Sequence, residues 1–446
     1  MDILLICTTF FPDTAISAVR SYMLADRLAK LGHNVTVLRS GEFENKPFDD
    51  DGMADMSFEL ISALGKNSDA EKYMRGEYVP APAKAEKYPF LPPRVKTLCK
   101  AARDTAKLVI KKKPPNCVSR EVKVLHYQKK VIQKLSQRRF DVVFSTYGWL
   151  ENIYAGGFAK ELFGCKWIMD FRDFPLVEGK LSADLYWYKY EKAAMLYALK
   201  NADCITAVSD GLVDELKNAC EPKRIYTLRN GFDDERILDD VQTCKEKLTF
   251  CYTGRCYESR YDSMRFFVFI LARLIRQGRL DRDKVGFIYA GSDSQAVKEF
   301  FDKFGICDVL TDAGSVSRDE ALRIQLESDI YTVLSWNTKK DRGIMTGKFY
   351  EGIKAGKPII AVVSGDTPNS ELWQLQKNYN YGCCCEICTK QAGAKEIERF
   401  ILNAYNEKMK NGRLSYRPSK ELYDAFCYTT IARQLNDIMH ELVDEK

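Results

Sequence analysis

A cation and a carboxylate three residues apart are the residues whose spacing most suggests chemistry in this chain. Lys348 and Glu351 fall on one face of a short predicted helix that opens at Thr346 and Gly347. A helix N-terminus presents unpaired N–H groups and a positive dipole, so a lysine in its first turn is unfavourable unless it serves an anionic ligand. The stretch therefore predicts an anion site, with an ordinary surface helix between two strands as the alternative interpretation.

Strands and helices alternate on either side of this stretch, in two separate parts of the chain. In the first part we expect a strand, an amphipathic helix and a strand at 3–8, 15–31 and 35–38, which make one right-handed βαβ unit. The second part repeats this order, with a strand, a helix and a strand at 248–252, 263–277 and 285–290. The pattern predicts an α/β protein with two Rossmann-like halves.

Length and composition agree with a two-domain globular protein. The chain has 446 residues, 46% of them hydrophobic and 29% charged. A net charge of +6 is too small to indicate nucleic-acid binding. Fifteen scattered cysteines and no secretory signal predict free thiols in a reducing compartment. No apolar run is long enough to span a bilayer, so we expect a cytoplasmic protein.

Residues 41 to about 137 do not fit a compact doubly wound sheet. Within them the segment Arg94–Lys113 carries eight Lys or Arg residues against one Asp, and its apolar residues fall on one helical face. A basic amphipathic helix suits an anionic membrane surface, at which the protein would be peripheral. The alternative is a solvated helix that packs on the domain by its apolar face, and the sequence leaves both open.

Three stretches resemble retaining glycosyltransferases of family 4, which have the GT-B fold of two Rossmann-like domains with a cleft between them. The donor-helix stretch is GKFYEGIKAGKP, and the two others, FFPDTAISAVRSYMLADRLAKLGHNVTVL and STYGWLENIYAGGFAKELFGCKWIMDFRDF, resemble members from capsular and O-antigen clusters. The resemblance covers most of the chain except residues 42–137. It implies an N-terminal acceptor domain at 1–235 with that insertion, a hinge at 236–247, a donor domain at 248–427 and a final helix at 428–446 that crosses back.

The resemblance places a nucleotide-sugar donor, expected to be a UDP-sugar, in the second half. The glutamate in the position of Glu351 accepts hydrogen bonds from the ribose hydroxyls, while an arginine like Arg255 and a lysine beyond it hold the diphosphate. Fixed cations suit this role because charge develops on the outer phosphate as the sugar leaves. The donor-binding residues that we predict are Gly254, Arg255, Arg260, Gly291, Thr346, Gly347, Lys348 and Glu351.

On the first half we expect Asp170, Arg172 and Asp173 to contact the sugar or acceptor, because they follow a strand at the edge where open α/β sheets bind ligands. Asp13, Ala15 and Ile16 complete the acceptor side. We predict Arg255, Lys348 and Asp170 as the catalytic residues. The chain departs from the family at Ala15-Ile16, where many relatives have two glycines, and at Gly343, where relatives have a glutamate eight residues before Glu351.

No cofactor and no metal are expected. Family 4 enzymes are thought to use the donor phosphate as the base, and no Asp-x-Asp pair stands at a predicted strand end. Cys383, Cys384, Cys385 and Cys388 suggest a metal site. Because neighbouring residues of a strand point to opposite faces, however, a reduced strand followed by a loop is the better interpretation.

The predicted function is the transfer of a sugar from a nucleotide-sugar to a glycan or lipid-linked acceptor in surface polysaccharide biosynthesis. A GT-B epimerase is a lesser alternative, because it would require acid/base carboxylates and histidines in the cleft. The alternative from another class is a non-catalytic GT-B protein that scaffolds or regulates a polysaccharide assembly system. Ala15-Ile16 and Gly343 favour this alternative, and the set of Arg255, Lys348 and Glu351 opposes it.

Overall fold

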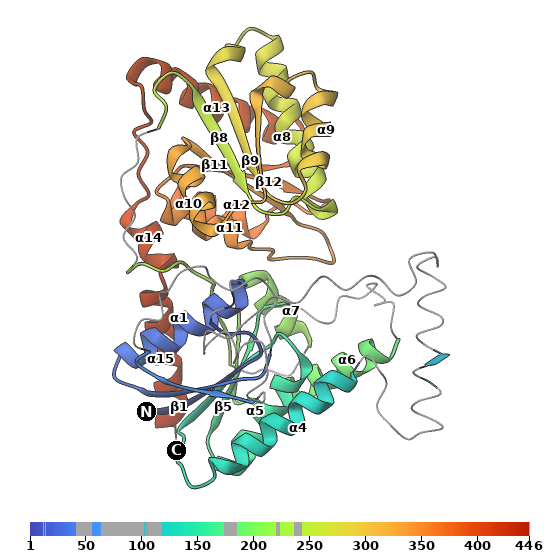
Figure 1. The fold of residues 1–446 in the computed structure, drawn as a ribbon, viewed down its shortest axis with the longest axis vertical. Coiled ribbons are helices and arrows are strands. Elements are labelled where there is room, and N and C mark those ends of the chain that lie inside the picture. The colour runs from blue at the N-terminus through green and yellow to red at the C-terminus, as the bar shows by residue number, and fades with distance from the viewer. Residues whose placement is uncertain are drawn as a thin grey trace. The chain divides into compact units, whose positions relative to one another are not determined.

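The computed structural model describes most of the chain and divides it into two compact units. The described residues are 1–11, 13, 15–41, 56–63, 102, 103, 105, 118–173, 185–219, 224–235 and 243–445. Unit 1 comprises 1–208, 212–229 and 431–446, and unit 2 comprises 209–211 and 230–430. Each unit is an α/β layer structure of its own (Figure 1).

Unit 1 is built on a parallel sheet of seven strands in the order β3-β2-β1-β4-β5-β6-β7. The strands are β1 Asp2–Cys7, β2 Asn34–Arg39, β3 Glu59–Ser62, β4 Val142–Thr146, β5 Lys166–Phe171, β6 Cys204–Ala207 and β7 Ile225–Thr227. Ile3, Leu4, Leu5 and Ile6 of β1 have no exposed surface. Continuous apolar runs of this kind form central strands because both faces of a parallel sheet are covered by helices.

Helices alternate with the strands along most of unit 1. They are α1 Ile16–Lys30, α4 Ser119–Lys134, α5 Leu150–Phe163, α6 Leu185–Asn201, α7 Asp210–Ala219 and the C-terminal α15 Tyr428–Asp444. Gly164 ends α5 in a left-handed conformation, as a C-terminal glycine commonly does. Helix α15 contacts this unit through Asn436, which lies 2.7 Å from His33, and through Gln434, which donates to the Thr227 carbonyl oxygen.

The structure corrects the expectation that residues 41–137 stand apart from the sheet. Residues 59–62 form β3, which pairs in parallel with β2, and α4 packs against α5. An ion pair of 2.6 Å between Arg138 and Glu59 joins the chain after α4 to this edge strand. Of the segment 94–113 only residues 102, 103 and 105 are described, each helical and exposed. The rest of the proposed membrane helix lies outside the described residues.

Unit 2 contains a parallel sheet of six strands in the order β10-β9-β8-β11-β12-β13. The strands are β8 Leu248–Thr253, β9 Val285–Ala290, β10 Leu310–Gly314, β11 Ile330–Trp336, β12 Ile359–Ser364 and β13 Gly382–Glu386. The helices are α8 Glu258–Arg276, α9 Ser294–Lys303, α10 Arg318–Glu327, α11 Gly347–Lys354, α12 Glu371–Tyr379, α13 Gln391–Asn411 and α14 Lys420–Phe426. Short 3₁₀ turns occur at Arg282–Lys284, Cys307–Val309 and Ile387–Thr389.

Helices cover both faces of this sheet and enclose two hydrophobic cores. Helices α8, α9 and α13 cover one face, and α10, α11 and α12 cover the other (Figure 1). The predicted N-cap of α10 is present, because the Ser317 side chain accepts from the Glu320 amide.

The cysteines of β13 follow the strand alternation. Cys383 and Cys385 belong to the core under α8, α9 and α13, whereas Cys384 belongs to the opposite core. Burial raises the pKa of the Cys385 thiol to about 12. Within the described ranges, all cysteines are free thiols and no cluster of His, Cys, Asp and Glu could hold a metal ion. A 3₁₀ turn, rather than the expected loop, follows the strand.

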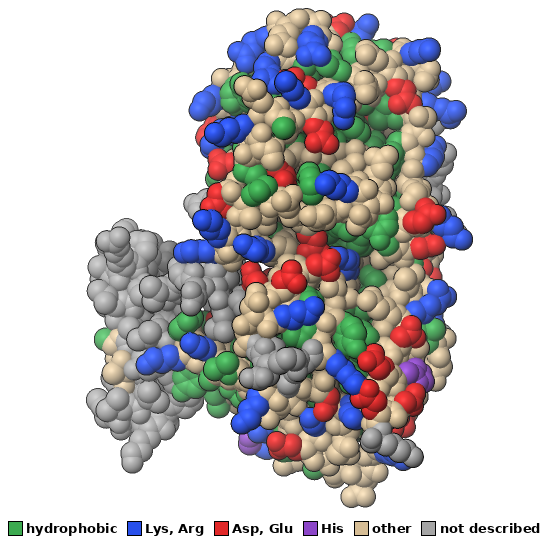
Figure 2. All heavy atoms as spheres, turned by 180° about the vertical axis from the view of Figure 1, so that it is seen from behind, with side chains coloured by type: hydrophobic (Ala, Val, Ile, Leu, Met, Phe, Trp, Pro, Cys, Tyr) green, Lys and Arg blue, Asp and Glu red, His purple; other side chains and the backbone are tan. Residues whose placement is uncertain are grey.

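The surface of the described residues carries charges of both signs. Basic and acidic side chains are interspersed over the face drawn in Figure 2, in keeping with a formal net charge of only +6. Among the helices that the structure describes, none is both long and apolar enough to cross a membrane.

Candidate active site

The start of α11 is the local feature on which the candidate site is built. Thr346 is the N-cap residue, in an extended conformation, but its side chain makes no capping hydrogen bond. The Thr346 hydroxyl oxygen is buried and has no hydrogen-bond partner, and the residue is 8% exposed. A threonine at this position normally accepts from an amide of the first turn. A buried hydroxyl without a partner beside unpaired helical N–H groups can donate hydrogen bonds to an anionic ligand.

Lys348 and Glu351 form an ion pair in this first turn. Lys348 Nζ lies 3.1 Å from Glu351 Oε1 and 3.2 Å from Oε2. The Lys348 and Glu351 side chains are 22% and 38% exposed. Solvent therefore screens their interaction only in part, and a ligand can still reach both groups. The pair holds a cation that would otherwise oppose the helix dipole, and it leaves that cation available to an anion.

The loop after β8 approaches this lysine closely. Gly254 has a φ of +121°, which residues with a side chain rarely adopt, and a Cβ built there would lie 2.5 Å from Lys348 Cε. The Gly254 amide donates to the Ala290 carbonyl oxygen at 2.6 Å, which joins the ends of β8 and β9. A Cβ on Gly291 would collide with the Gly254 carbonyl oxygen. Gly254, Gly291, Lys348 and Glu351 thus meet at the carboxyl edge of one sheet.

The two predicted arginines differ in their surroundings. The Arg255 side chain is 73% exposed, with Nε 3.9 Å from Asp293, so its guanidinium can meet a ligand phosphate. Arg260 Nη1 instead donates to the Arg255 carbonyl oxygen at 2.7 Å and to the Tyr252 hydroxyl at 3.1 Å. Arg260 therefore braces the loop that carries Arg255.

The backbone at Gly343 explains how the chain departs from the family pattern. Its φ is +66°, in the left-handed region. A glutamate here would adopt that conformation only at a cost, because its Cβ would crowd the following carbonyl oxygen. The left-handed backbone at Gly343 therefore favours glycine over the glutamate of the family pattern.

Three residues that the sequence analysis did not single out surround Glu351. Tyr331 and Gln325 donate to Glu351 Oε2, and Thr253 contacts both of them. All three are buried. A polar residue at a buried strand position is a signal that could have drawn attention to Thr253. Nothing in local sequence spacing links Gln325 to Glu351.

In unit 1 the predicted acceptor-side residues follow β1 and β5. Asp13 is buried and accepts from the Ala15 amide at 2.8 Å, so its carboxylate shapes the turn before α1. Ala15 is the N-cap of α1, and Ile16 is 51% exposed. Arg172 Nε donates to the Tyr147 carbonyl oxygen at 2.7 Å, and Asp173 is exposed beside it. These residues share the carboxyl edge of the sheet of unit 1.

The geometry of Asp170 argues against the predicted catalytic role. It lies inside β5 with no exposed surface. Arg20 donates to both of its carboxylate oxygens, at 2.8 and 3.1 Å, and Thr146 and Thr206 donate one hydrogen bond each. Arg20 also donates to the carbonyl oxygens of Leu228 and Arg229. A carboxylate with four donors and no exposure ties strands together and does not reach a substrate.

A buried acid that the sequence analysis missed is Glu151 in the first turn of α5. It is 4% exposed. Burial raises the pKa of Glu151 to about 8; the hydrogen bond from its own amide opposes this shift, and the Glu121 carboxylate adds to it. Thr8 donates to Oε1 at 3.5 Å. Its place at the carboxyl edge of β1 and β4 follows from tertiary packing of α4 on α5, which a single sequence does not reveal.

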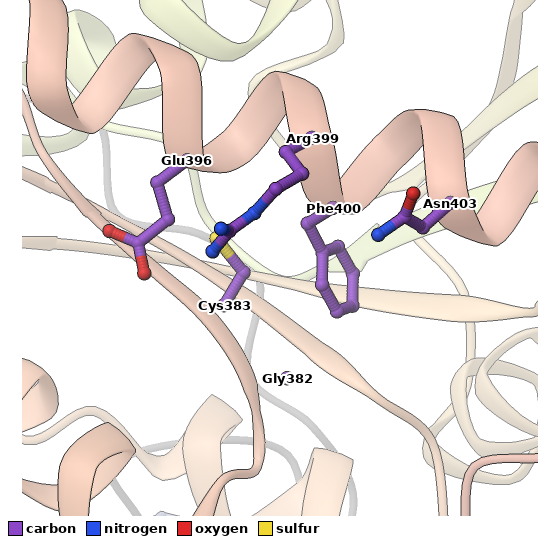
Figure 3. Close-up of a pocket in the computed structure, with 6 residues that line it drawn as sticks. All are labelled: Gly382, Cys383, Glu396, Arg399, Phe400 and Asn403. Atoms are coloured by element: carbon purple, nitrogen blue, oxygen red, sulfur yellow. The ribbon is translucent and has the colours of Figure 1, made fainter.

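A hollow of about 310 Å³ lies elsewhere in unit 2. Figure 3 shows it between α13 and the first residues of β13, with Arg399 and Glu396 above Cys383. Gly382 pairs with Ile359 at the amino end of the neighbouring strand. The hollow is therefore at the opposite end of the strands from Thr253 and Gly254, and it is not part of the candidate site.

Comparison with known proteins supports the two-domain fold. Residues 17–231 match the glycosyl transferase 4-like domain. The chain superposes on sucrose-phosphate synthase from Thermosynechococcus elongatus over 100% of both chains, with a TM-score of 0.58 and 14% identity. It superposes on HepE from Anabaena, solved in complex with UDP and glucose, over 99% and 100% of the two chains, with a TM-score of 0.58 and 12% identity.

A third solved structure is the lipopolysaccharide outer core galactosyltransferase WaaB in its apo form. It matches over 99% of both chains, with a TM-score of 0.55 and 11% identity. No curated protein matches this chain. The chain therefore has the GT-B fold of two Rossmann-like domains, and the match to the glycosyl transferase 4-like domain covers residues 17–231. The capsular or O-antigen type that the sequence suggested is a finer assignment, which we take up below.

Proposed function

We propose that this protein is a retaining glycosyltransferase that moves a sugar from a nucleotide-sugar, in the first instance a UDP-sugar, to a glycan or lipid-linked acceptor. The observation that carries the proposal is the set of groups at the carboxyl edge of unit 2. Lys348, Glu351 and the unsatisfied Thr346 hydroxyl surround the start of α11, and Gly254 brings the Arg255 loop against the lysine. This set offers two cations, helical N–H groups and one carboxylate to a single ligand.

Each group of the set has a role in binding a nucleoside diphosphate. Arg255 and Lys348 would neutralise the phosphates, and the N–H groups at Gly347 would donate to one phosphate oxygen. Glu351 would accept from the ribose hydroxyls. Because negative charge grows on the outer phosphate as the sugar leaves, both cations would be more strongly engaged in the transition state than in the ground state.

Our choice of nucleotide and of pathway is based on similarity to known glycosyltransferases. HepE was solved with UDP and glucose, so UDP is the first nucleotide to test. The stretches that resemble capsular and O-antigen enzymes support a place in surface polysaccharide biosynthesis, at the cytoplasmic face of the membrane. WaaB acts on the lipopolysaccharide outer core, which is also a surface glycan.

Thermal unfolding with UDP, GDP and ADP tests the proposal. A nucleotide present at one hundred times its dissociation constant stabilises the native protein by about 2.7 kcal/mol, which raises the unfolding midpoint. We expect one of the three to do so, and Lys348→Ala to reduce the shift. Arg265→Ala, an exposed arginine of α8 paired with Asp262, is the matched control and should retain it. No shift with any nucleotide would refute the donor site.

A second candidate function is favoured by Gly343. The family's carboxylate is absent and the backbone there is left-handed, which suits a protein that binds a nucleotide-sugar without turning it over. Such a scaffold or regulatory subunit would bind the nucleotide as described above. It would release no nucleoside diphosphate from a nucleotide-sugar in the presence of acceptor glycans, and a transferase would.

A further inference from the structure

We infer that Tyr331, Gln325 and Thr253 are positioning residues that fix which oxygen of Glu351 is presented to the donor. The inference rests on the proposed function, because it takes Glu351 as the acceptor of the ribose hydroxyls. The three residues come from β11, α10 and β8, so they join three elements of unit 2 behind α11.

The contacts form a closed network. The Tyr331 hydroxyl donates to Glu351 Oε2 at 3.0 Å, and Gln325 Nε2 donates to the same oxygen at 3.1 Å. Gln325 Nε2 also donates to the Thr253 hydroxyl oxygen at 2.8 Å, and that oxygen lies 2.9 Å from the Tyr331 hydroxyl. Tyr331 has no exposed surface, Thr253 is 2% exposed and Gln325 is 4% exposed.

The direction of every proton in this network follows from the donor inventory. The Gln325 amide nitrogen has two protons, and its two contacts use both. Thr253 therefore accepts from Gln325. Tyr331 has one proton, and it goes to the Glu351 carboxylate, which can only accept. Thr253 therefore donates its own proton to the Tyr331 oxygen. Burial, together with the Glu351 carboxylate, raises the pKa of the Tyr331 hydroxyl well above its usual value, so this donor keeps its proton.

The network makes the two oxygens of Glu351 unequal. Oε2 receives two hydrogen bonds from buried neutral groups in addition to Lys348, whereas Oε1 contacts only Lys348 among the described residues. A ligand hydroxyl would therefore be accepted by Oε1. The two neutral donors also keep the carboxylate in place when Lys348 turns toward a phosphate, which an isolated ion pair would not do.

Packing alone does not explain these residue types. Phenylalanine, valine and methionine would fill the same spaces without burying polar atoms, and burying an unpaired hydroxyl or amide is costly. Here each buried polar atom is directed at Glu351 or at a group that donates to it. A fully satisfied buried network of this kind holds a unique geometry.

Calorimetric titration with UDP and with 2′,3′-dideoxy-UDP tests the inference on the full-length protein. Tyr331→Phe removes the donor to Oε2, and we expect it to weaken UDP binding by ~5–10-fold. The same variant should leave binding of the dideoxy nucleotide unchanged, because that nucleotide has no hydroxyls for Glu351. Thr253→Val should act in the same direction, and Thr253→Ser, which keeps the hydroxyl, should restore wild-type affinity.

Tyr381→Phe is the matched control. Tyr381 is also fully buried in unit 2, and its hydroxyl donates to the Leu372 carbonyl oxygen at 2.8 Å, away from Glu351. The Tyr381→Phe variant should lower the unfolding midpoint as Tyr331→Phe does. It should change neither the affinity for UDP nor the affinity for 2′,3′-dideoxy-UDP. Equal effects of Tyr331→Phe and Tyr381→Phe on UDP binding would overturn the inference and leave the donor site standing. A wild type that binds both nucleotides equally, or neither, would overturn the ribose role of Glu351 and the inference with it.

Discussion

At the scale of single residues, the reactivity of a charged side chain depends on its burial and on its hydrogen-bond partners. Glu351 and Lys348 are only partly exposed and contact each other, and Arg255 is largely in solvent. Glu151 and Asp170 are both buried carboxyls, but one has few donors and the other has four. The difference in donors matters most for Glu151, whose pKa burial raises to about 8, so that it is protonated at neutral pH.

The free energy of unfolding should depend on pH through the protonation of Glu151. Its native pKa of about 8 lies above the ordinary value of 4.5, so the native state binds more protons than the unfolded state between these limits. Stability from this group is therefore present at low pH and is lost as pH rises toward 8, with a slope of about 1.4 kcal/mol per pH unit for one proton. Glu151→Gln should flatten the change in urea midpoint between pH 6 and pH 8.

The exposed Glu161 on the same helix provides the control. Glu161→Gln should leave the pH dependence as in the wild type. The charged groups that face Glu151 are Glu121 and Arg120, and burial also raises the pKa of Glu121. If the urea midpoint of Glu151→Gln changed with pH as much as that of the wild type, Glu151 would be ionised in the native protein.

The two cations at the donor site should affect turnover more than binding. Arg255→Ala and Lys348→Ala should each lower kcat by a larger factor than they raise KM, because the charge that they meet grows in the transition state. Initial rates with a nucleotide-sugar and a glycan acceptor would measure this. EDTA should leave activity intact. Loss of turnover with EDTA that Mg²⁺ restores would contradict the expectation that no metal is needed.

At the scale of elements, the buried pair of Arg20 and Asp170 joins α1 and β5 to the strands beside them. We expect Asp170→Asn to destabilise unit 1 by ~3–5 kcal/mol, because it leaves a buried arginine without its counter-charge. The kcat of the protein that remains folded should not change. Urea unfolding and initial rates would measure the two effects.

Glu59→Gln removes a partly exposed partner of Arg138 and is the control for this variant, with an expected cost of ~0–1 kcal/mol. A stable Asp170→Asn variant with a greatly reduced kcat would restore the catalytic role that the sequence suggested.

The elements that sequence predicts well are those with continuous apolar runs or clear helical spacing. The expected strand at 285–290 is β9, and the final helix expected at 428–446 is α15, Tyr428–Asp444. The missed strands, β3 and β10, have largely partly exposed or exposed residues and so lack an apolar run. The missed helix α4 lies in a stretch dominated by loop and basic signals, and its packing on α5 is a tertiary contact.

The candidate donor site was predictable for a related reason. Lys348, Glu351 and Gly254 stand at element ends, where strand and helix patterns locate them in three dimensions. Gln325, Tyr331 and Thr253 contact Glu351 through residues far apart in sequence, so only the folded sheet reveals them. Asp170 was expected just after a strand, whereas the structure places it next to the last residue of β5, buried among four hydrogen-bond donor groups.

At the scale of the whole molecule, the segment 94–113 is the part that gives the chain its net positive charge. It contains eight Lys or Arg residues and one Asp, whereas the whole chain has a net charge of only +6. We propose that it docks the enzyme on anionic membranes, where each Lys or Arg contributes on the order of 1 kcal/mol. Binding should be strong to anionic vesicles, weak to neutral ones, and reduced by salt as the screening length falls from ~10 Å at 0.1 M. Vesicle sedimentation would measure it.

Charge reversal within the segment is the matched test. Reversal at Lys96, Lys100, Arg103 and Lys107 should release the protein from vesicles without changing nucleotide affinity. The control reverses four exposed lysines of unit 2: Lys284, Lys298, Lys303 and Lys390. A wild type that ignores anionic vesicles at low salt would identify the segment as a structural insert.

The central claim is that unit 2 binds a nucleotide-sugar with Glu351 on the ribose, and calorimetric titration of UDP into the wild type and Glu351→Gln tests it most directly. We predict that Glu351→Gln weakens binding by ~1.5–3 kcal/mol, because it loses a hydrogen bond to a charged acceptor. Glu327 is an acid of α10 that is exposed to the same extent as Glu351 and is paired with Arg323, and Glu327→Gln should bind UDP as the wild type does. Equal affinities of the wild type and a well-folded Glu351→Gln would contradict the claim.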